Sequence, residues 1–176
     1  MQITHITLNN FRKFDNFSIK FEPITLITGV NGAGKTSILE AIYTLSLGHS
    51  FHTRKINPIL KIGQEKFTIF AKLTNGEDNN LDNNLEHKIG LSKSKDNITY
   101  RKIDQEKITS QTPILNKMPV LAITPQKFSL LRQPASNRRT LLDWGVYYKN
   151  PEFIKVLKAA KKVISQRNTL LKAKAP

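Results

Sequence analysis

A chain of 176 residues is long enough to bury the core of one domain, or of one domain and part of a second. It carries 28 Lys and Arg against 13 Asp and Glu, a formal net charge of +15, and a field of this sign attracts polyanions such as nucleic acid. It has no cysteine, which excludes disulfides and thiolate metal sites. No run of about 18 apolar residues is present, and the first residues lack a signal-peptide pattern. We therefore expect a cytoplasmic protein with no membrane partner.

The positive charge is concentrated toward the end of the chain. Residues 127–176 hold twelve basic and two acidic residues, a surplus of +10. This surplus favours nucleic acid as a partner. A charge excess that keeps the protein in solution, or an acidic partner domain, is the less favoured alternative.

The first thirty residues predict three strands. Residues 2–8 and 17–21 alternate between apolar and polar side chains, as half-buried strands do. Asn9 and Asn10 are expected to end the first strand. After Pro23, the apolar run at residues 24–27 predicts a buried strand.

A glycine-rich loop with the sequence GVNGAGKT follows that run, and a helix is expected from there to a stop at Gly48. This is the complete phosphate-binding loop pattern in its strand–loop–helix context. Its backbone N–H groups and the start of the helix favour an anion. Lys35 is expected to reach the β- and γ-phosphates, and the Thr36 hydroxyl to hold Mg²⁺. The predicted ligands here are Gly29, Asn31, Gly32, Ala33, Gly34, Lys35, Thr36 and Ser37.

The middle of the chain predicts an antiparallel meander. Residues 66–74 alternate, with four apolar side chains on one face, and residues 86–92 and 97–103 read as two further strands. Between the first two of these segments, a tandem Asp-Asn-Asn-Leu repeat at residues 78–85 is expected to form a hairpin tip. Residues 120–123 predict a short buried strand.

The last third predicts helices. Residues from Ser136 to Tyr148 have helical spacing, and Asn150-Pro151 is a start signal for an amphipathic helix of about 24 residues, or about 36 Å. Its apolar stripe fits ordinary core packing. Because lysines coat the rest of its surface, an arm or hairpin helix is the sharper interpretation.

The chain shows no convincing second acidic motif of a P-loop ATPase. Asp104 ends an alternating strand and Asp143 lies in a helical pattern, where pairing with a nearby arginine is the simpler role. No Leu-Ser-x-Gly segment occurs either. The sequence therefore predicts nucleotide binding with little or no turnover by these residues alone.

Five blocks, in order along the chain, resemble the RecF family of DNA repair ATPases, which are related to RecN and to the structural-maintenance-of-chromosomes (SMC) proteins. These blocks are residues 10–14, 29–43, 45–53, 124–145 and 166–171. The resemblance covers nearly all 176 residues and corresponds to the first half of such proteins. It implies an α/β ABC-ATPase-like P-loop lobe with an antiparallel meander over residues 1–135, and the start of a helical arm over 136–176.

The resemblance also implies ligands and partners. Arg12 and Lys13 would lie near ATP, and Gln126 is the candidate for the loop that senses the γ-phosphate and Mg²⁺, although capping a turn after Pro125 explains it as well. Family members form an ATP-dependent dimer around DNA and load recombinase at single-strand gaps. They act with recombination mediators, support the SOS response and hydrolyse ATP slowly. Three residues depart from the family pattern, namely His52, Gln126 and Gln133.

Arg138 and Arg139 are the most specific candidates for DNA contacts. They are adjacent in a segment whose other residues are typical of helix packing. An internal pair with Asp143 is the alternative. The rival function is a transporter-type or other P-loop ATPase without a DNA role, which the basic second half of the chain disfavours.

Overall fold

The computed structural model describes residues 1–74, 86–124, 139, 142–143, 145–147, 149–150 and 152–173. Internal contacts divide the chain into two compact units, Met1–Ala122 and Ile123–Pro176. None of the helices in the described ranges is long and apolar enough to cross a membrane.

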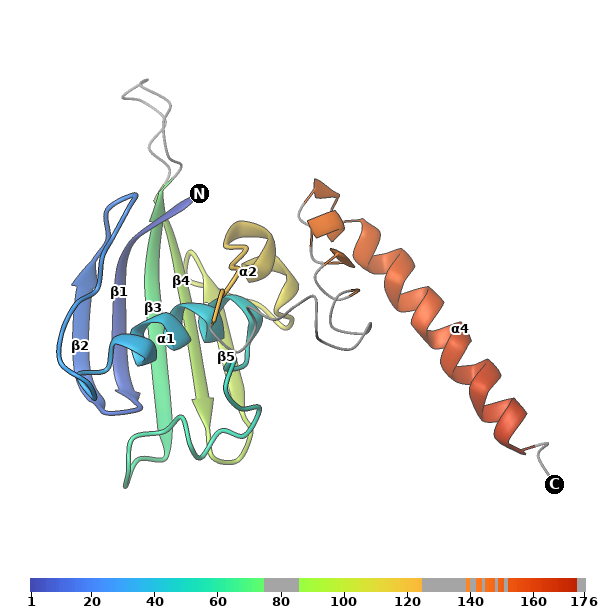
Figure 1. Ribbon diagram of the computed structural model, residues 1–176, viewed down its shortest axis with the longest axis horizontal. Helices are drawn as coiled ribbons and strands as arrows, with labels where there is room; N and C mark the ends of the chain where they lie inside the picture. Colours follow the sequence, from blue (N-terminus) through green and yellow to red (C-terminus); the bar gives the residue numbers. More distant parts are fainter. Residues whose placement is uncertain are drawn as a thin grey trace, which may run out of the picture. The chain divides into compact units, whose positions relative to one another are not determined.

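The first unit is built on a six-stranded antiparallel sheet with the order β2-β1-β3-β4-β5-β6 (Figure 1). This confirms the predicted meander. The strands are β1 Gln2–Phe11, β2 Phe14–Lys20, β3 Lys66–Thr74, β4 His87–Ser94, β5 Thr99–Ile103 and β6 Glu106–Lys107. Asn9 and Asn10 do not end the first strand as expected. Asn10 adopts a left-handed conformation, φ 53, which asparagine tolerates, and β1 continues to Phe11.

Two helices accompany the sheet, α1 Lys35–Leu47 and the short α2 Thr112–Lys117. In Figure 1, α1 crosses in front of the strands, and Ala41 and Leu45 from this helix join the apolar core formed by β1, β3, β4 and β5. The alternation predicted for β3 is confirmed, because Phe67, Ile69, Ala71 and Leu73 are all fully buried. Gly48 ends α1 as predicted, with φ 78 and its N–H donating to Thr44 O at 2.8 Å.

Two predicted strands are wrong. Residues 24–27 have no strand conformation, and Ile24 and Leu26 are 94% and 86% exposed. Residues 120–123 are not a strand either, and Ile123 is 73% exposed. An apolar run becomes a buried strand only where neighbouring strands pair with its backbone and cover its faces. No strand in the described ranges pairs with either segment.

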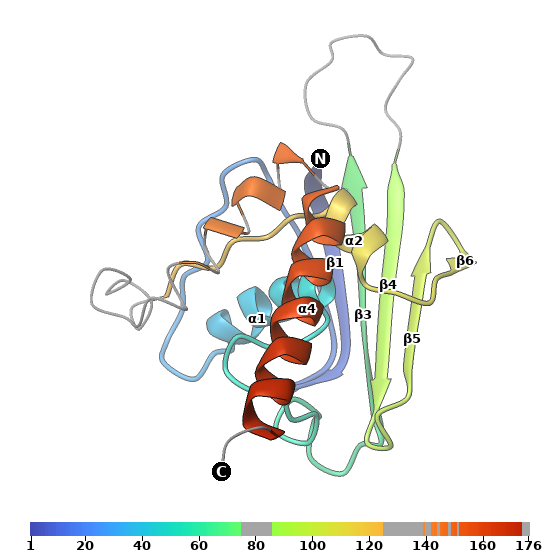
Figure 2. The same cartoon turned by 90° about the vertical axis from the view of Figure 1, so that its right-hand side faces the viewer.

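The second unit contains helix α4 Phe153–Ala173, which has 21 residues and is slightly shorter than expected. The Asn150 side chain accepts a hydrogen bond from the Glu152 N–H at 3.1 Å, near the start of this helix. None of its side chains is buried, so the described residues do not pack its apolar stripe into a core. Figure 2 shows the helix along its length, as one continuous coil. The expected hairpin tip at residues 78–85 lies outside the described residues.

Candidate nucleotide-binding site

The glycine-rich loop folds as a turn that leads directly into α1. Gly32 and Gly34 have φ values of 80 and 100, a left-handed region that glycine enters without a Cβ clash. Gly34 is the N-cap of α1, and the Ile38 N–H donates to Gly34 O at 3.1 Å. The first turn of α1 contains no acidic residue. Its positive end is therefore not neutralised locally and favours an anion.

Lys35 folds back over the loop from the first position of α1. Its ammonium group donates to Gly29 O at 2.7 Å and to Val30 O at 2.9 Å. A second ammonium group, from Lys13 in the β1–β2 turn, donates to Gly32 O at 2.6 Å. Two cations from distant parts of the sequence thus lie on the same loop.

A cavity of about 570 Å³ opens beside the loop. It is lined by Arg12, Lys13, Asn31, Gly32, Gly34, Lys35, Thr36, Ser37, Pro58, Leu60 and Ile62. Eight of the predicted ligands are therefore brought together. Gly29 and Ala33 belong to the loop without lining the cavity. Gln126 and Arg138 lie outside the described residues, and Arg139 is an exposed helical residue of the second unit.

Three lining residues were missed by sequence reasoning: Pro58, Leu60 and Ile62. They lie in an irregular segment before β3, where no periodicity marks them. Ile62 is 96% exposed, so the cavity has an apolar rim as well as a cationic one. Nothing in the sequence places these residues beside the phosphate-binding loop at residues 29–36, because only the tertiary fold brings the two segments together.

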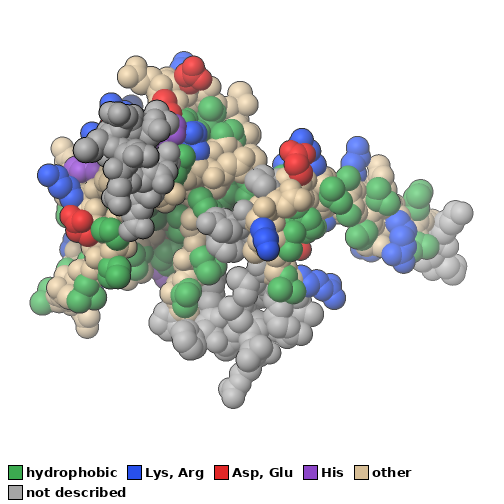
Figure 3. Space-filling view, turned by 90° about the horizontal axis from the view of Figure 1, so that it is seen from above, with side chains coloured by type: hydrophobic (Ala, Val, Ile, Leu, Met, Phe, Trp, Pro, Cys, Tyr) green, Lys and Arg blue, Asp and Glu red, His purple; other side chains and the backbone are tan. Residues whose placement is uncertain are grey.

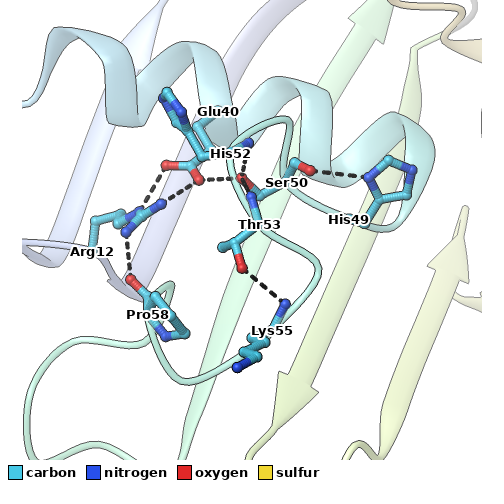
Figure 4. Close-up of polar contacts among 8 residues, drawn as sticks. All are labelled: Arg12, Glu40, His49, Ser50, His52, Thr53, Lys55 and Pro58. Atoms are coloured by element: carbon cyan, nitrogen blue, oxygen red, sulfur yellow. Dashed lines mark hydrogen bonds and ion pairs between the residues drawn. The ribbon is translucent and has the colours of Figure 1, made fainter. Parts of the chain in front are cut away.

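Arg12 makes the densest set of contacts near the cavity (Figure 4). Its guanidinium donates to both carboxylate oxygens of Glu40, with Nε at 2.7 Å from Oε2 and Nη2 at 2.5 Å from Oε1, and Nη1 donates to Pro58 O at 2.5 Å. Glu40 is only 2% exposed and also accepts a hydrogen bond from the Ser50 hydroxyl. Sequence reasoning missed Glu40, although an acid among the apolar side chains Ile38, Ala41 and Leu45 was a usable signal.

Aromatic rings pack on the far part of α1. Tyr43 makes edge-on contacts with His49 and Phe51, with ring centroids 5.7 Å and 5.4 Å away. Partial burial raises the pKa of Tyr43, and the charge of Arg54 acts against this shift. The phenol therefore stays neutral at physiological pH.

Comparison with known proteins assigns the chain to a family. A family model described as "AAA ATPase domain" matches residues 1–175. The chain belongs to the AAA ATPase domain family. It is 35% identical over 173 residues to the DNA replication and repair protein RecF of Psychromonas ingrahamii, and 36% identical over 177 residues to that of Shewanella oneidensis. These alignments cover 98% and 100% of this chain but 46% and 47% of the relatives. The chain thus spans about half the length of the curated relatives it matches.

Solved structures agree with the sequence matches. The recombination mediator protein RecF with ATP superposes with a TM-score of 0.81 at 27% identity, over 98% of this chain and 45% of that one. An SMC ATPase superposes with a TM-score of 0.65 at 20% identity, over 82% of this chain and 99% of that one, which shows the shared fold alone. The predicted fold class and the likeness to the N-terminal half of RecF are therefore confirmed.

Proposed function

We propose that this chain is the ATP-binding part of a RecF-type DNA repair protein. The observation that carries the proposal is the complete phosphate-binding loop at the start of α1, beside a cavity of about 570 Å³. Loop N–H groups, the helix end and the Lys35 ammonium group are all positive or hydrogen-bond donors, as a triphosphate requires. Lys35 would hold the β- and γ-phosphates, with Lys13 as a second cation.

Mg²⁺ would enter with the nucleotide. In the described ranges, no three His, Cys, Asp or Glu side chains form a cluster that could hold a metal ion. Thr36 is exposed and lines the cavity, so its hydroxyl is available as a ligand. Mg²⁺ is commonly held by few protein oxygens together with substrate phosphates and water, so this donor set fits a metal that binds with ATP. Gln126 remains the sequence-based candidate for a further ligand.

The apolar rim suits the base of the nucleotide. Pro58, Leu60 and Ile62 line the cavity together with the loop. A flat heteroaromatic ring that lies against them would remove exposed apolar surface from water. The cationic part of the cavity would then take the phosphates, and the apolar part the base.

Partner binding follows from the relatives and from charge. We propose that the protein acts in the cytoplasm on gapped or single-stranded DNA, as an ATP-dependent dimer that works with recombination mediators, with an ATPase lobe at 1–135 and an arm from residue 136. Figure 3 shows basic and apolar side chains side by side along α4. The exposed cations of this helix are Lys155, Lys158, Lys161, Lys162, Arg167 and Lys172. With Arg138 and Arg139 they would contact DNA phosphates.

Calorimetric titration with ATP and Mg²⁺ tests the nucleotide site. Lys35→Ala removes the ammonium group from the loop and is expected to abolish measurable binding. Lys66→Ala, which removes an exposed lysine at the start of β3, is the matched control and should bind as the unmodified chain does. Equal ATP affinity for Lys35→Ala and Lys66→Ala would refute the proposed site.

A further inference from the structure

The guanidinium group of Arg12 is already bound by the protein. Its two-pronged edge, the part that recognises a carboxylate or a phosphate, faces both oxygens of Glu40 at 2.7 Å and 2.5 Å. The remaining terminal nitrogen donates to Pro58 O at 2.5 Å, and the backbone N–H of Arg12 donates to Ile59 O at 2.7 Å. Arg12 therefore lines the cavity with its donors directed to protein acceptors rather than to a ligand.

Glu40 makes this arrangement hard to undo. Its side chain is 2% exposed, and a buried carboxylate without its cation is strongly destabilising. The Ser50 hydroxyl donates to the same carboxylate and accepts from the His52 N–H at 2.9 Å. Figure 4 shows that the pair joins three segments, namely the β1–β2 turn, α1 and the segment at residues 50–58.

The backbone at Arg12 is held in an unusual conformation. Its φ of 55 lies in the left-handed region, which is unfavourable for a residue with a long side chain. Such a conformation persists only where surrounding contacts determine it. The contacts of Arg12 with Glu40, Pro58 and Ile59 meet this condition and fix the turn.

The same turn lies directly on the phosphate-binding loop. Lys13, the next residue, donates from its ammonium group to Gly32 O at 2.6 Å. The ring of Phe14 lies so close to Gly34 that a Cβ on Gly34 would be 2.7 Å from Phe14 Cζ. A shift of the turn would therefore move both the Lys13 ammonium group and the packing of the loop.

We propose that Arg12 is a positioning residue for the nucleotide site, which acts through Glu40 to hold the β1–β2 turn on the phosphate-binding loop and to place Lys13 at the phosphates. This inference rests on the proposed ATP site. It gives the two neighbouring cations different tasks: Lys13 meets the ligand, and Arg12 places Lys13.

A double-mutant cycle between Lys13 and Glu40 tests this inference by ATP affinity. Lys13→Ala removes the placed cation, and Glu40→Gln removes the charge that holds Arg12 while nearly keeping the side-chain shape. Each is expected to weaken ATP binding by roughly tenfold, which corresponds to about 1.4 kcal/mol. The double variant should bind no more weakly than either single variant, because both changes disable the same cation.

Additive losses in the double variant would overturn the inference. So would unchanged or tighter ATP binding by Glu40→Gln, because release of Arg12 from Glu40 helps only if Arg12 itself meets phosphate. A purely structural role would lower the melting temperature and leave the effects of Lys13 and Glu40 independent. If Glu40→Gln does not fold, Ser50→Ala takes its place in the double-mutant cycle, because it removes one hydrogen bond from Glu40. The same non-additive pattern is then expected, with a smaller loss of ATP affinity.

Asp15→Asn is the matched control. It breaks the ion pair of Asp15 with Lys61, which also ties the β1–β2 hairpin to the segment before β3 but does not involve Glu40. ATP affinity should be unchanged, and a loss equal to that of Glu40→Gln would contradict the special role of the Arg12–Glu40 pair. Failure of the proposed ATP site is distinguishable, because the unmodified chain and Lys35→Ala would then bind ATP equally or not at all.

Discussion

Gly34 and Phe14 are in such close contact that only glycine fits at position 34. A Cβ built on Gly34 would lie 2.7 Å from Phe14 Cζ and 3.2 Å from Lys13 Cδ. Gly34 also has a φ of 100. The glycine required by the phosphate-binding loop is therefore required a second time, by the turn that packs on it.

Gly34→Ala should abolish ATP binding and lower stability. The new methyl group must displace Phe14 or distort the loop, in addition to the cost of a left-handed alanine. Gly63→Ala is the control, because Gly63 has a φ of 83 but nothing within 4 Å of its added Cβ. Melting curves should show a loss of about 1–2 kcal/mol for Gly63→Ala, with unchanged ATP affinity, and a larger loss for Gly34→Ala. Equal losses would mean that Phe14 simply moves aside.

Phe67→Ala should be among the most destabilising changes in the sheet. Phe67 is fully buried and packs edge-on against Phe11, with ring centroids 5.3 Å apart. Truncation of a buried phenylalanine costs about 3–5 kcal/mol, which lowers the melting temperature of a chain of this size by roughly 6–20 °C. Tyr100→Ala, at a side chain that is 61% exposed, should change it by no more than a degree or two.

The sequence predicted most of the sheet, since regular alternation is a local property of each strand. β3 shows this well, because its four buried side chains occupy alternate positions. The prediction of a strand failed for residues 24–27, because burial of this apolar segment depends on neighbouring strands rather than on the segment itself. Sequence reasoning also missed α2 and β6, whose six and two residues are too short for a periodic signal.

Replacement of both Ile24 and Leu26 by serine should leave the melting temperature unchanged. Both side chains are almost fully exposed, and surface substitutions usually change stability by less than about 0.5 kcal/mol. The double change should also reduce binding of a hydrophobic dye and self-association in sedimentation, because exposed apolar segments promote both. A fall of several degrees in melting temperature would show that these side chains are buried in solution.

Asp104→Asn should remove a pH-dependent part of stability. Partial burial opposes ionisation of Asp104, but hydrogen bonds from the Lys88 N–H and from His87, and the charges of His87 and Lys117, hold the pKa of Asp104 below its usual 3.8. A lowered carboxylate pKa stabilises the folded state above the unfolded-state pKa, and this contribution is lost as the pH falls through the folded-state value.

Melting temperatures measured at a series of pH values from 7 down to 2 test this effect. Asp104→Asn should be less stable than the unmodified chain at pH 7, and the difference should shrink as the pH falls below about 4. Asp96→Asn, in the exposed β4–β5 turn, controls for the loss of a surface carboxylate. A difference that stays constant down to pH 2 would show that Asp104 acts through its shape and not its charge.

The candidate site, like the fold, could be predicted from the sequence only in part. The loop and its lysine were predictable, since an eight-residue motif specifies both the backbone path and the chemistry. The Arg12–Glu40 pair was not, because 28 residues separate its members and only the packing of β1 against α1 brings them together. Pro58, Leu60 and Ile62 join the cavity for the same tertiary reason.

DNA binding should be electrostatic and independent of sequence. The surplus of +10 over residues 127–176 predicts that the logarithm of the binding constant falls with the logarithm of salt concentration. For five or six neutralised phosphates the slope is about −5. Fluorescence anisotropy of labelled single-stranded and gapped DNA over a series of salt concentrations measures it. An affinity that does not depend on salt would refute the electrostatic account.

Replacement of both Arg138 and Arg139 by alanine tests the candidate contacts. If both arginines touch phosphate, the slope should become shallower by about one or two, since each lost phosphate contact removes about 0.9 from it. The melting temperature should change little. If they instead pair with Asp143, the melting temperature should fall while the slope stays the same. Lys102→Ala with Lys107→Ala removes the same charge from the first unit. An equal change of slope in that control would mean that net charge, and not these two arginines, governs DNA binding.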